Sequence, residues 1–598
     1  MLCSPISATM VYMVDRQMFR TFASVAVMLL LGLAAPSLLA QDAPAVPTLA
    51  PPTLVPAAAD ERVDFLSAES AIAEITASGI FRVGVLYNDP PYSELTFQGE
   101  LRGFDVDLLR KIAAEWDCEL ELLQVTRLNA LDRLNRADVH ALASAIVRYR
   151  DNDSEVEFSQ TYLQGAQALL VRKDAPAQSR AELLDQPLGY VLGTRAEKAI
   201  AVWSAQAGRP LNLLPHLTLD RAVAALMHAE ISAVIAEKQA LHRASADFAD
   251  SVRVLDDAVT VEARAFAVRR QDAPLRDALN KTIQLLASAG ELEVLFREYF
   301  PDESYNIEAL PIWSGVGDEA LPSQFANAIV YPSTYALPRI KNSGSLKVGG
   351  VSVSAPASTT GMGRLDTLNR ALAAELARRW GVALEMTSSD TASAAGMLSS
   401  GEVDLVLGMK PAWNLAGEMD FSMPYLLHGD RLMVRTNSGI RGFGDLRGRF
   451  VGILFGAGAA RERAQAWADS INVSVRYIQT SESEAALTLL DYNNANAIYA
   501  DNLALLAHLD AHPNALRLTN RWYSRGYYAI GLPYNDIDLR LLVNYTIQAL
   551  IKDGTLYRLS ADLIVSDALP AFDLIPGTSS YAGFSLSDPA SSGPAAQS

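Results

Sequence analysis

Most of the chain consists of one pattern that occurs twice. The run Gly79–Gly84 (Gly-Ile-Phe-Arg-Val-Gly) recurs as Gly344–Gly349 (Gly-Ser-Leu-Lys-Val-Gly), and Val156–Tyr162 recurs as Met419–Tyr425. Further pairs are Gly193 and Gly456, Glu237 and Asp501, and Gly290 and Gly554. All keep an offset between 263 and 265 positions. Because this offset holds over so long a stretch, it predicts one whole domain duplicated in tandem, not a solenoid of about 20–50-residue repeats.

Length and charge narrow the class of protein. At 598 residues the chain suits a few domains of ordinary size, and each copy is long enough to bury its own core. The formal net charge is -18, and a polyanion would be repelled by such a surface. We therefore expect no nucleic-acid partner.

The first 40 residues resemble an export signal. Arg16 and Arg20 precede an apolar run over Ala23–Leu33, and small residues lead to Ala40. A membrane anchor is the alternative, but the run is shorter than the roughly 20 residues of a spanning helix. We expect cleavage and an extracytoplasmic protein, in the periplasm or on the cell surface. Possible internal starts are Met10, Met13 and Met18.

Composition divides the remainder of the chain. Pro and Ala dominate after the signal, which is typical of an extended tether, and Ser and Gly dominate the end, which is typical of a disordered tail. The expected parts are a signal peptide at 1–40, a tether at 41–70, a first domain at 71–302, a partly packed linker at 303–338, a second, diverged domain at 339–566 and a tail at 567–598.

Within each copy, strand-like runs alternate with helical patterns. In the first copy, Phe81–Leu86 predicts a strand and Asp105–Ala114 a helix, and the same alternation continues beyond them. This order predicts an α/β fold with a mainly parallel sheet covered by helices. In such folds ligands bind beyond the carboxyl ends of the strands.

Several short motifs of the first copy, taken together, point to a family. They are the turn Pro90-Pro91-Tyr92, the run Gly103–Leu108, the pair Phe158-Ser159, the pair Gly193-Thr194 and the closing Ala289–Leu292. This combination resembles the family 3 extracytoplasmic solute-binding proteins, the polar amino acid receptors of ABC importers. The resemblance covers about 75–300 and, more weakly, 340–565.

The resemblance implies two tandem periplasmic-binding-protein-like domains of type II, each of two α/β lobes joined by a two-strand hinge. The implied hinges fall near Arg172, Thr260, Arg435 and Tyr523. The implied function is an exported, monomeric protein that captures a small polar solute, expected in the first copy, and delivers it to an ABC-transporter permease. An amino acid or a related amine or organic acid would be the solute.

Other functions remain open at this point. Relatives on this fold include periplasmic dehydratases, for which Glu237 would be the candidate general acid. A ligand-sensing module for a separate membrane partner is the other alternative. The sequence has no Walker loop, metal-ligand spacing or nucleophile elbow, so we expect neither a cofactor nor a metal, and no enzyme.

Neither copy keeps the family's usual carboxylate clamp. The arginine expected six positions before the Phe-Ser pair is Asn152 in the first copy and Leu415 in the second. A planar guanidinium suits a carboxylate because it donates two parallel hydrogen bonds. The candidate replacements are Arg127, Arg148 and Arg150. The alternative is that these arginines are simply solvated.

The remaining candidate ligand-binding residues follow from the same alignment. Glu237 and Asp501 stand where the family has a carboxylate that faces a ligand amine, although each is also a possible helix N-cap. Thr194 begins a helix whose backbone NH groups can receive an anion. Tyr92 matches an aromatic residue that lies against the ligand, and packing in the core is the alternative for it. The other candidates are Tyr87 and Asp89 in the same loop, and Lys410 and Trp413 in the second copy.

Overall fold

A computed structural model describes residues 69–586 except 145, 302, 304, 307–309, 318–319, 353–360, 455–457, 480–487, 492, 562–568, 571–574, 576–578 and 582–583. The expected signal peptide, most of the tether and most of the tail lie outside the described residues. Ser67–Ser598 form one unit. We call 71–302 copy 1 and 339–566 copy 2.

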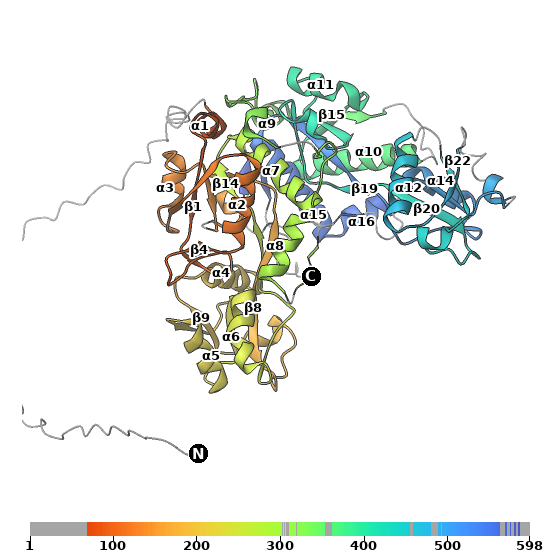
Figure 1. The fold of residues 1–598 in the computed structure, drawn as a ribbon. Helices are drawn as coiled ribbons and strands as arrows, with labels where there is room; N and C mark the ends of the chain where they lie inside the picture. The colour runs from red at the N-terminus through yellow and green to blue at the C-terminus, as the bar shows by residue number, and fades with distance from the viewer. Residues whose placement is uncertain are drawn as a thin grey trace, which may run out of the picture. The chain divides into compact units, whose positions relative to one another are not determined.

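Lobe 1 of copy 1 is a five-stranded sheet in the order β5-β1-β6-β14-β7, with β1 parallel to β5 and β6 (Figure 1). Helices α2, α7 and α8 pack together beside it. Its elements are α1 (Ala71–Ser78), β1 (Ile80–Val85), β2 (Asn88–Asp89), β3 (Ser93–Leu95), β4 (Leu101–Arg102), α2 (Phe104–Glu115), β5 (Glu119–Gln124), α3 (Ala130–Asn135), β6 (Ala141–Ala143), η2 (Arg150–Asn152), β7 (Val156–Phe158), β14 (Ala267–Arg269), α7 (Ala273–Ser288) and α8 (Glu291–Tyr299).

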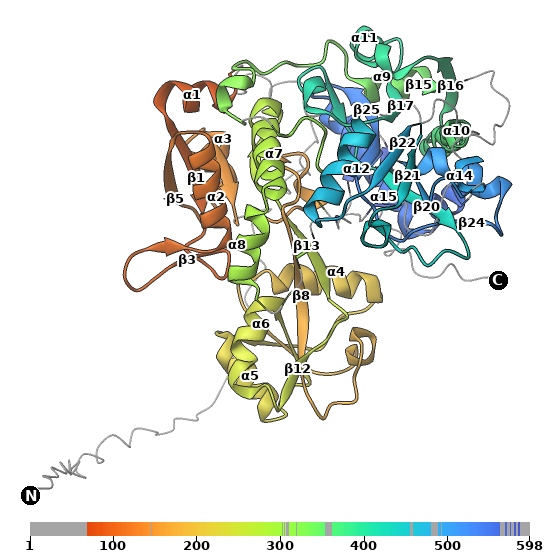
Figure 2. The same ribbon diagram turned by 45° about the vertical axis from the view of Figure 1, so that its right-hand side comes forward.

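Lobe 2 of copy 1 is a second sheet in the order β10-β9-β11-β8-β12, with β13 paired to β8. Figure 2 shows α5 and α6 beside β8 and β12. Its elements are β8 (Leu163–Arg172), η3 (Arg180–Leu183), β9 (Leu188–Val191), α4 (Ala196–Ala207), β10 (Leu213–His216), α5 (Leu219–Met227), β11 (Ala233–Glu237), α6 (Lys238–Ser245), η4 (Ala246–Phe248), β12 (Val252–Val254) and β13 (Thr260–Arg264).

Copy 2 repeats both sheets in the same order. Its lobe 1 sheet runs β16-β15-β17-β25-β18, and its lobe 2 sheet runs β22-β21-β23-β20-β24. Lobe 1 contains α9 (Ala336–Ser343), β15 (Ser345–Val351), α10 (Gly361–Trp380), β16 (Ala383–Ser388), η7 (Thr391–Ser393), α11 (Ala394–Ser400), β17 (Leu405–Met409), η8 (Trp413–Leu415), β18 (Met419–Phe421), β19 (Leu426–His428), β25 (Gly526–Pro533), α15 (Ile537–Lys552) and α16 (Thr555–Ser560). Lobe 2 contains β20 (Asp430–Arg435), η9 (Phe443–Leu446), β21 (Phe450–Ile453), α12 (Gly458–Ser470), β22 (Arg476–Gln479), β23 (Ala497–Asp501), α14 (Asn502–Ala511) and β24 (Leu516–Leu518). Outside the copies lie η6 (Pro322–Gln324), β26 (Ser579–Tyr581) and β27 (Phe584–Leu586).

The predicted fold class, with a duplicated domain of two lobes, is therefore confirmed. Of the expected hinge positions, Tyr523 lies where copy 2 returns from β24 of lobe 2 to β25 of lobe 1, whereas Arg172 and Arg435 lie at the far ends of β8 and β20 and were wrong. The chain leaves lobe 1 between β7 and β8 and returns between β13 and β14. Backbone hydrogen bonds from Ser159 to Phe266 and from Tyr162 to Arg264 hold the two crossing segments together. Arg172 lies at the far end of β8, because this strand continues through the sheet of lobe 2 for ten residues before it ends.

The two copies also repeat individual side-chain contacts in their cores. In copy 1 the indole Nε1 of Trp116 donates to Thr282 Oγ1 at 2.8 Å, and in copy 2 Trp380 Nε1 donates to Thr546 Oγ1 at 2.9 Å. Both threonines are fully buried. The duplication therefore preserved buried hydrogen bonds as well as strand order.

Replacing either threonine with valine should lower the free energy of unfolding by a similar amount. Valine has nearly the same volume as threonine, but it removes the acceptor of a buried indole N–H. We expect a loss of about 1–3 kcal/mol for Thr282→Val and for Thr546→Val. Urea denaturation measures both. A loss at only one of the two sites would contradict the equivalence of these cores.

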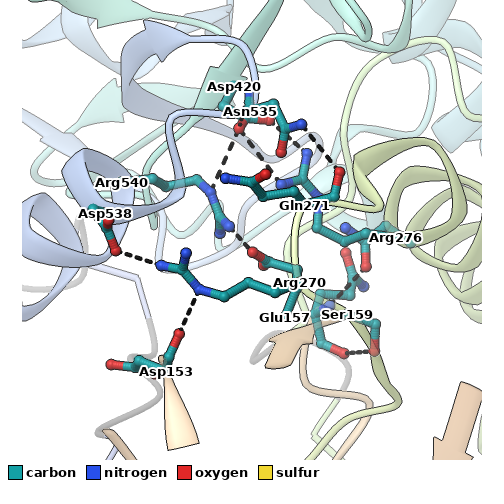
Figure 3. Close-up of polar contacts among 12 residues, drawn as sticks. Asp153, Glu157, Ser159, Arg270, Gln271, Arg276, Asp420, Asn535, Asp538 and Arg540 are labelled. Atoms are coloured by element: carbon teal, nitrogen blue, oxygen red, sulfur yellow. Dashed lines mark hydrogen bonds and ion pairs between the residues drawn. The ribbon is translucent and has the colours of Figure 1, made fainter. Parts of the chain in front are cut away.

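A buried interface of reciprocal ion pairs joins copy 1 to copy 2 (Figure 3). Arg276 Nη2 of α7 lies 2.5 Å from Asp420 Oδ1 of β18, and Arg540 Nη2 of α15 lies 2.6 Å from Glu157 Oε1 of β7. Arg276 and Arg540 are equivalent residues, four positions after the N-cap aspartates of their helices, and Glu157 and Asp420 are equivalent in their strands. Each copy thus contributes the same face to the other, as in an isologous dimer.

Further contacts from both copies extend this interface. Tyr545 Oη donates to Asp153 Oδ1, and Asn535 Nδ2 donates to the carbonyl of Gln271. Arg270 pairs with Asp538, as Figure 3 also shows. Burial raises the pKa of Glu157, but the Arg540 and Arg276 guanidinium groups outweigh it and leave this pKa below its ordinary value. The charged state of the interface is therefore stabilised by pairing.

No helix among the described residues is both long enough and apolar enough to cross a membrane.

Candidate functional site

In copy 1, charged residues from both lobes meet across the cleft. Arg195, at the N-terminus of α4 in lobe 2, places Nη2 2.9 Å from Asp89 Oδ1 in lobe 1. Arg127 of lobe 1 donates from Nη1 to the Gly193 carbonyl of lobe 2 at 2.8 Å. These contacts close the lobes on each other through side chains of the protein itself.

Arg264 lies beside these residues, where the chain crosses between the lobes. It ends β13, just before the chain returns to lobe 1, and its guanidinium carbon lies 3.1 Å from the centre of the Tyr92 ring. Arg264 Nη1 is 3.4 Å from Asp89 Oδ2. Tyr92 Oη donates to Glu237 Oε1 at 2.8 Å, and Glu237 Oε2 accepts from the Ala240 backbone at 2.9 Å. Both oxygens of Glu237 are thus engaged, one of them in capping α6.

Burial dominates the electrostatics of this cluster. It raises the pKa of Glu237, although Arg264 lowers it in part, and it raises the pKa of the Tyr92 hydroxyl well above its usual range. Among the described residues, both carboxylate oxygens of Glu262 and the Nε and Nη2 of Arg264 are buried without a hydrogen-bond partner. The cleft of copy 1 is therefore a dense network of its own charges.

Other candidates of copy 1 lie away from this network. Thr194 Oγ1 donates to the Val191 carbonyl, and Tyr87 packs against the core of lobe 1. Arg148 lines a cavity of about 140 Å³ between the copies. Arg150 is buried in the same interface, where its guanidinium lies 4.1 Å from the centre of the Tyr545 ring.

Copy 2 has a cavity of about 770 Å³ in its cleft. Both lobes and the linker contribute to it: Lys410 and Tyr527 come from lobe 1, Arg463 and Asp501 from lobe 2, and Trp313 from the linker. The polar described residues that line it are Ser314, Lys410, His428, Asp430, Arg463, Asp501, Ser524, Arg525 and Tyr527. Positive and negative groups therefore face the same space.

Neighbouring residues hold the charged side chains of this cavity in position. Arg463 Nε lies 2.6 Å from Asp430 Oδ2, which also accepts from Tyr499 Oη at 3.1 Å. The Asp430 carboxylate raises the pKa of Arg463. Asp501 caps α14 by accepting from the Leu503 backbone, and its Oδ2 is 3.4 Å from His428 Nδ1. About a third of the Asp501 side chain is exposed, so it can still contact a solute.

Sequence differences account for the contrast between the two clefts. Arg195 and Glu262 of copy 1 correspond to Gly458 and Gly526 of copy 2, so two long charged side chains are replaced by none. Arg264 corresponds to Tyr528, whose ring packs in the core beside His428. Copy 2 therefore lacks the side chains that occupy these two positions of the cleft in copy 1.

The second aromatic candidate of copy 2 has a different position. Trp413 donates from Nε1 to Gln284 Oε1 of copy 1 at 2.9 Å, and its ring lies 4.6 Å from that of Trp313. Trp413 therefore contacts both the linker and copy 1. It is not among the residues that line the cavity in the cleft of copy 2. The loop of copy 2 that matches the Tyr92 turn, 355–357, lies outside the described residues.

In the part of the chain that the structure describes, no group of three His, Cys, Asp or Glu side chains is arranged to hold a metal ion.

Comparison with known families agrees with this architecture. The model of the bacterial extracellular solute-binding proteins, family 3, matches residues 81–302 and again 346–564. The chain belongs to this family. Both copies are thus members of it, and the second is as complete a match in length as the first.

Individual relatives of the family are similar to one copy at a time. The arginine-binding extracellular protein ArtP of Bacillus subtilis is 26% identical over 208 residues, which are 34% of this chain and 78% of ArtP. The ABC transporter glutamine-binding protein GlnH of Bacillus subtilis is 22% identical over 209 residues, 34% of this chain and 75% of GlnH. A crystal structure of a mutant ArgBP from T. maritima is 23% identical and matches 39% of this chain and 100% of its own, with a TM-score of 0.33. Both Bacillus relatives are named as binding proteins.

Proposed function

We propose that copy 2 captures a small polar solute between its lobes, and that the exported protein delivers this solute to an ABC importer. The solute is an amino acid or a related amine or organic acid. Closure of the two lobes about their crossing strands would enclose it. In this proposal copy 1 binds no solute, and its two lobes are held together by its own side chains.

The cavity in the cleft of copy 2 is the observation that carries this proposal. Its volume of about 770 Å³ falls within the range of about 300–1,000 Å³ typical of small-molecule sites. It also lies where α/β folds bind ligands, beyond the carboxyl end of β23, which terminates at Asp501.

The charges of the cavity favour a solute with both a cationic and an anionic group. Lys410 and Arg463 are suitable partners for a carboxylate, and Asp501 is a suitable partner for an amine. Arg463 is oriented by Asp430, so a guanidinium is held in place before a solute arrives. Such preorganisation lowers the entropic cost of binding.

The family relationship supports both parts of the proposal. ArtP and GlnH carry amino acids in their names, and GlnH is named as part of an ABC transporter. The arginine clamp is replaced in both copies of this chain, so the present solute need not be the one those relatives bind.

Thermal unfolding of the purified protein against amino acids, amines, small organic acids and short peptides tests the function. A captured solute at one hundred times its Kd should stabilise the folded state by about 2.7 kcal/mol and raise the Tm accordingly. The absence of a shift across all four classes would contradict solute capture.

A further inference from the structure

Arg264 occupies the interior of copy 1 in an unusual setting for a cation. Only 4% of its side chain is exposed, and its guanidinium faces the ring of Tyr92. Arg195, the other guanidinium near this ring, is farther from it, at 5.8 Å. The carboxylates around Arg264 come from both lobes and are those of Asp89, Asp105, Glu237 and Glu262.

Arg264 lies beside two residues that the sequence predicts to contact a solute. Tyr92 is the residue expected to lie against the ligand, and Glu237 is the residue expected to face its amine. In the structure Tyr92 contacts Arg264, and the Tyr92 hydroxyl bonds to Glu237, whose pKa Arg264 lowers in part against the larger effect of burial. A side chain of the protein thus takes the position against Tyr92 that a cationic solute was expected to take.

We propose that Arg264 is an internal ligand of copy 1, and that its guanidinium fills a latent binding site for guanidinium compounds. Copy 1 is then a solute-binding domain that is closed on its own side chain. The proposal does not depend on which solute copy 2 captures, because it concerns a cleft in a different copy.

The geometry favours a guanidinium over other cations. A planar guanidinium can stack on an aromatic ring while its edge donates to carboxylates, whereas an ammonium group is a compact point charge without such a plane. The guanidinium carbon of Arg264 lies over the Tyr92 ring, 3.1 Å from its centre, while Nη1 lies near Asp89 and Asp105. Burial lowers the pKa of Arg264, but Tyr92 and the carboxylates raise it by a larger amount. The net pKa lies above the ordinary value, so the group stays charged.

The β13 strand explains why this residue can take the place of a solute. β13 pairs with β8 up to Arg264↔Leu163, and the chain then returns to lobe 1. Arg264 therefore lies where both lobes meet, within reach of the Tyr92 loop. Tyr528, its counterpart in copy 2, carries no charge, and its ring lies tilted against that of His428.

Chemical rescue of Arg264→Ala in the full chain tests the proposal. The substitution leaves buried carboxylates without their cation, and we expect the Tm to fall by roughly 10 °C. Millimolar methylguanidinium chloride should restore at least half of this loss, and the same concentration of methylammonium chloride should not. The wild-type Tm should not rise with methylguanidinium.

Arg297→Ala is the matched control. Arg297 is 72% exposed and pairs with Glu293 on α8 of the same copy. Its loss should leave the Tm nearly unchanged, and methylguanidinium should give no rescue. Equal rescue of both variants, or of Arg264→Ala by both cations, would overturn a site specific for guanidinium.

A second measurement decides the matter if Arg264→Ala does not fold. Methylguanidinium and L-arginine are titrated calorimetrically into the Asp501→Asn protein, in which copy 1 is intact and copy 2 is weakened. An internal ligand predicts no saturable heat from copy 1, so any heat from the weakened copy 2 should persist after Glu237→Gln. Saturable binding that Glu237→Gln then abolishes would show that copy 1 takes an external solute and would overturn the proposal. Failure of solute capture by copy 2 would instead appear in the wild-type thermal shifts.

Discussion

Replacing Arg540 with alanine is expected to lower the free energy of unfolding by about 3–5 kcal/mol, because it removes one partner of a buried ion pair. Arg540 and Glu157 are both nearly fully buried, and their closest atoms are 2.6 Å apart. Without the guanidinium, the Glu157 carboxylate remains inside the interface between the copies with no equally close cation.

The charge-swapped pair separates this effect from a loss of packing. The double variant Glu157→Arg with Arg540→Glu keeps one positive and one negative group in contact. Because Arg540 Nε also lies 3.6 Å from Asp420 Oδ2, the new glutamate meets a second carboxylate, and we expect only part of the loss to be recovered. Each single swap should be at least as harmful as Arg540→Ala, since it adds like-charge repulsion. Urea denaturation of the four proteins gives the coupling energy.

Arg297→Ala serves as the surface control here too. Its ion pair with Glu293 is largely exposed, so its loss should change stability by less than about 1 kcal/mol. If Arg540→Ala were as mild as this control, the two copies would not be held together by the contacts shown in Figure 3.

The second large effect concerns solute binding. Asp501→Asn should weaken the affinity for the captured solute by roughly 10–100-fold, because a hydrogen bond to a charged group contributes about 1.5–3 kcal/mol. Asparagine is as good an N-cap as aspartate, so the cap of α14 that accepts from Leu503 should survive. The apo Tm should therefore change little while the Kd rises.

Glu237→Gln is the matched variant, because Glu237 holds the equivalent position in copy 1 and also caps a helix. Capture in copy 2 predicts a Kd within about twofold of the wild type for this variant, well inside the tenfold that about 1.4 kcal/mol represents. Isothermal titration calorimetry measures both. The reverse result, a large loss with Glu237→Gln and none with Asp501→Asn, would place the solute in copy 1.

The sequence predicted the repeated architecture well, because this depends on local patterns. A constant offset between motifs such as Val156–Tyr162 and Met419–Tyr425 identifies equivalent strands without any knowledge of their packing. The two lobes follow from the family resemblance. The hinge expected near Arg172 was misplaced because a strand's length within its sheet, ten residues for β8, depends on pairing partners far along the chain.

The contents of the clefts could not be predicted in the same way. Arg264 belongs to no motif, and it meets Tyr92 and Asp89 only because β13 pairs with β8 at the crossing between the lobes. Alignment of the two copies does indicate that their clefts differ. It shows Arg195 and Glu262 replaced by Gly458 and Gly526, a change in side-chain volume that alters how much of the cleft is filled.

One feature of the sequence indicates the interface between the copies. Glu157 and Asp420 are acidic residues within otherwise apolar strands, and both are buried. A buried carboxylate requires a cation. Its partner could not be identified from one sequence, because Arg540 and Arg276 belong to the opposite copy.

A crystal structure of the protein with its bound solute tests the central claim most directly. Capture by copy 2 predicts one solute per chain, between Lys410 and Arg463 on one side and Asp501 on the other, with Arg264 still against Tyr92 in copy 1. A solute bound between Tyr92 and Glu237, with Arg264 displaced from the ring, would contradict it.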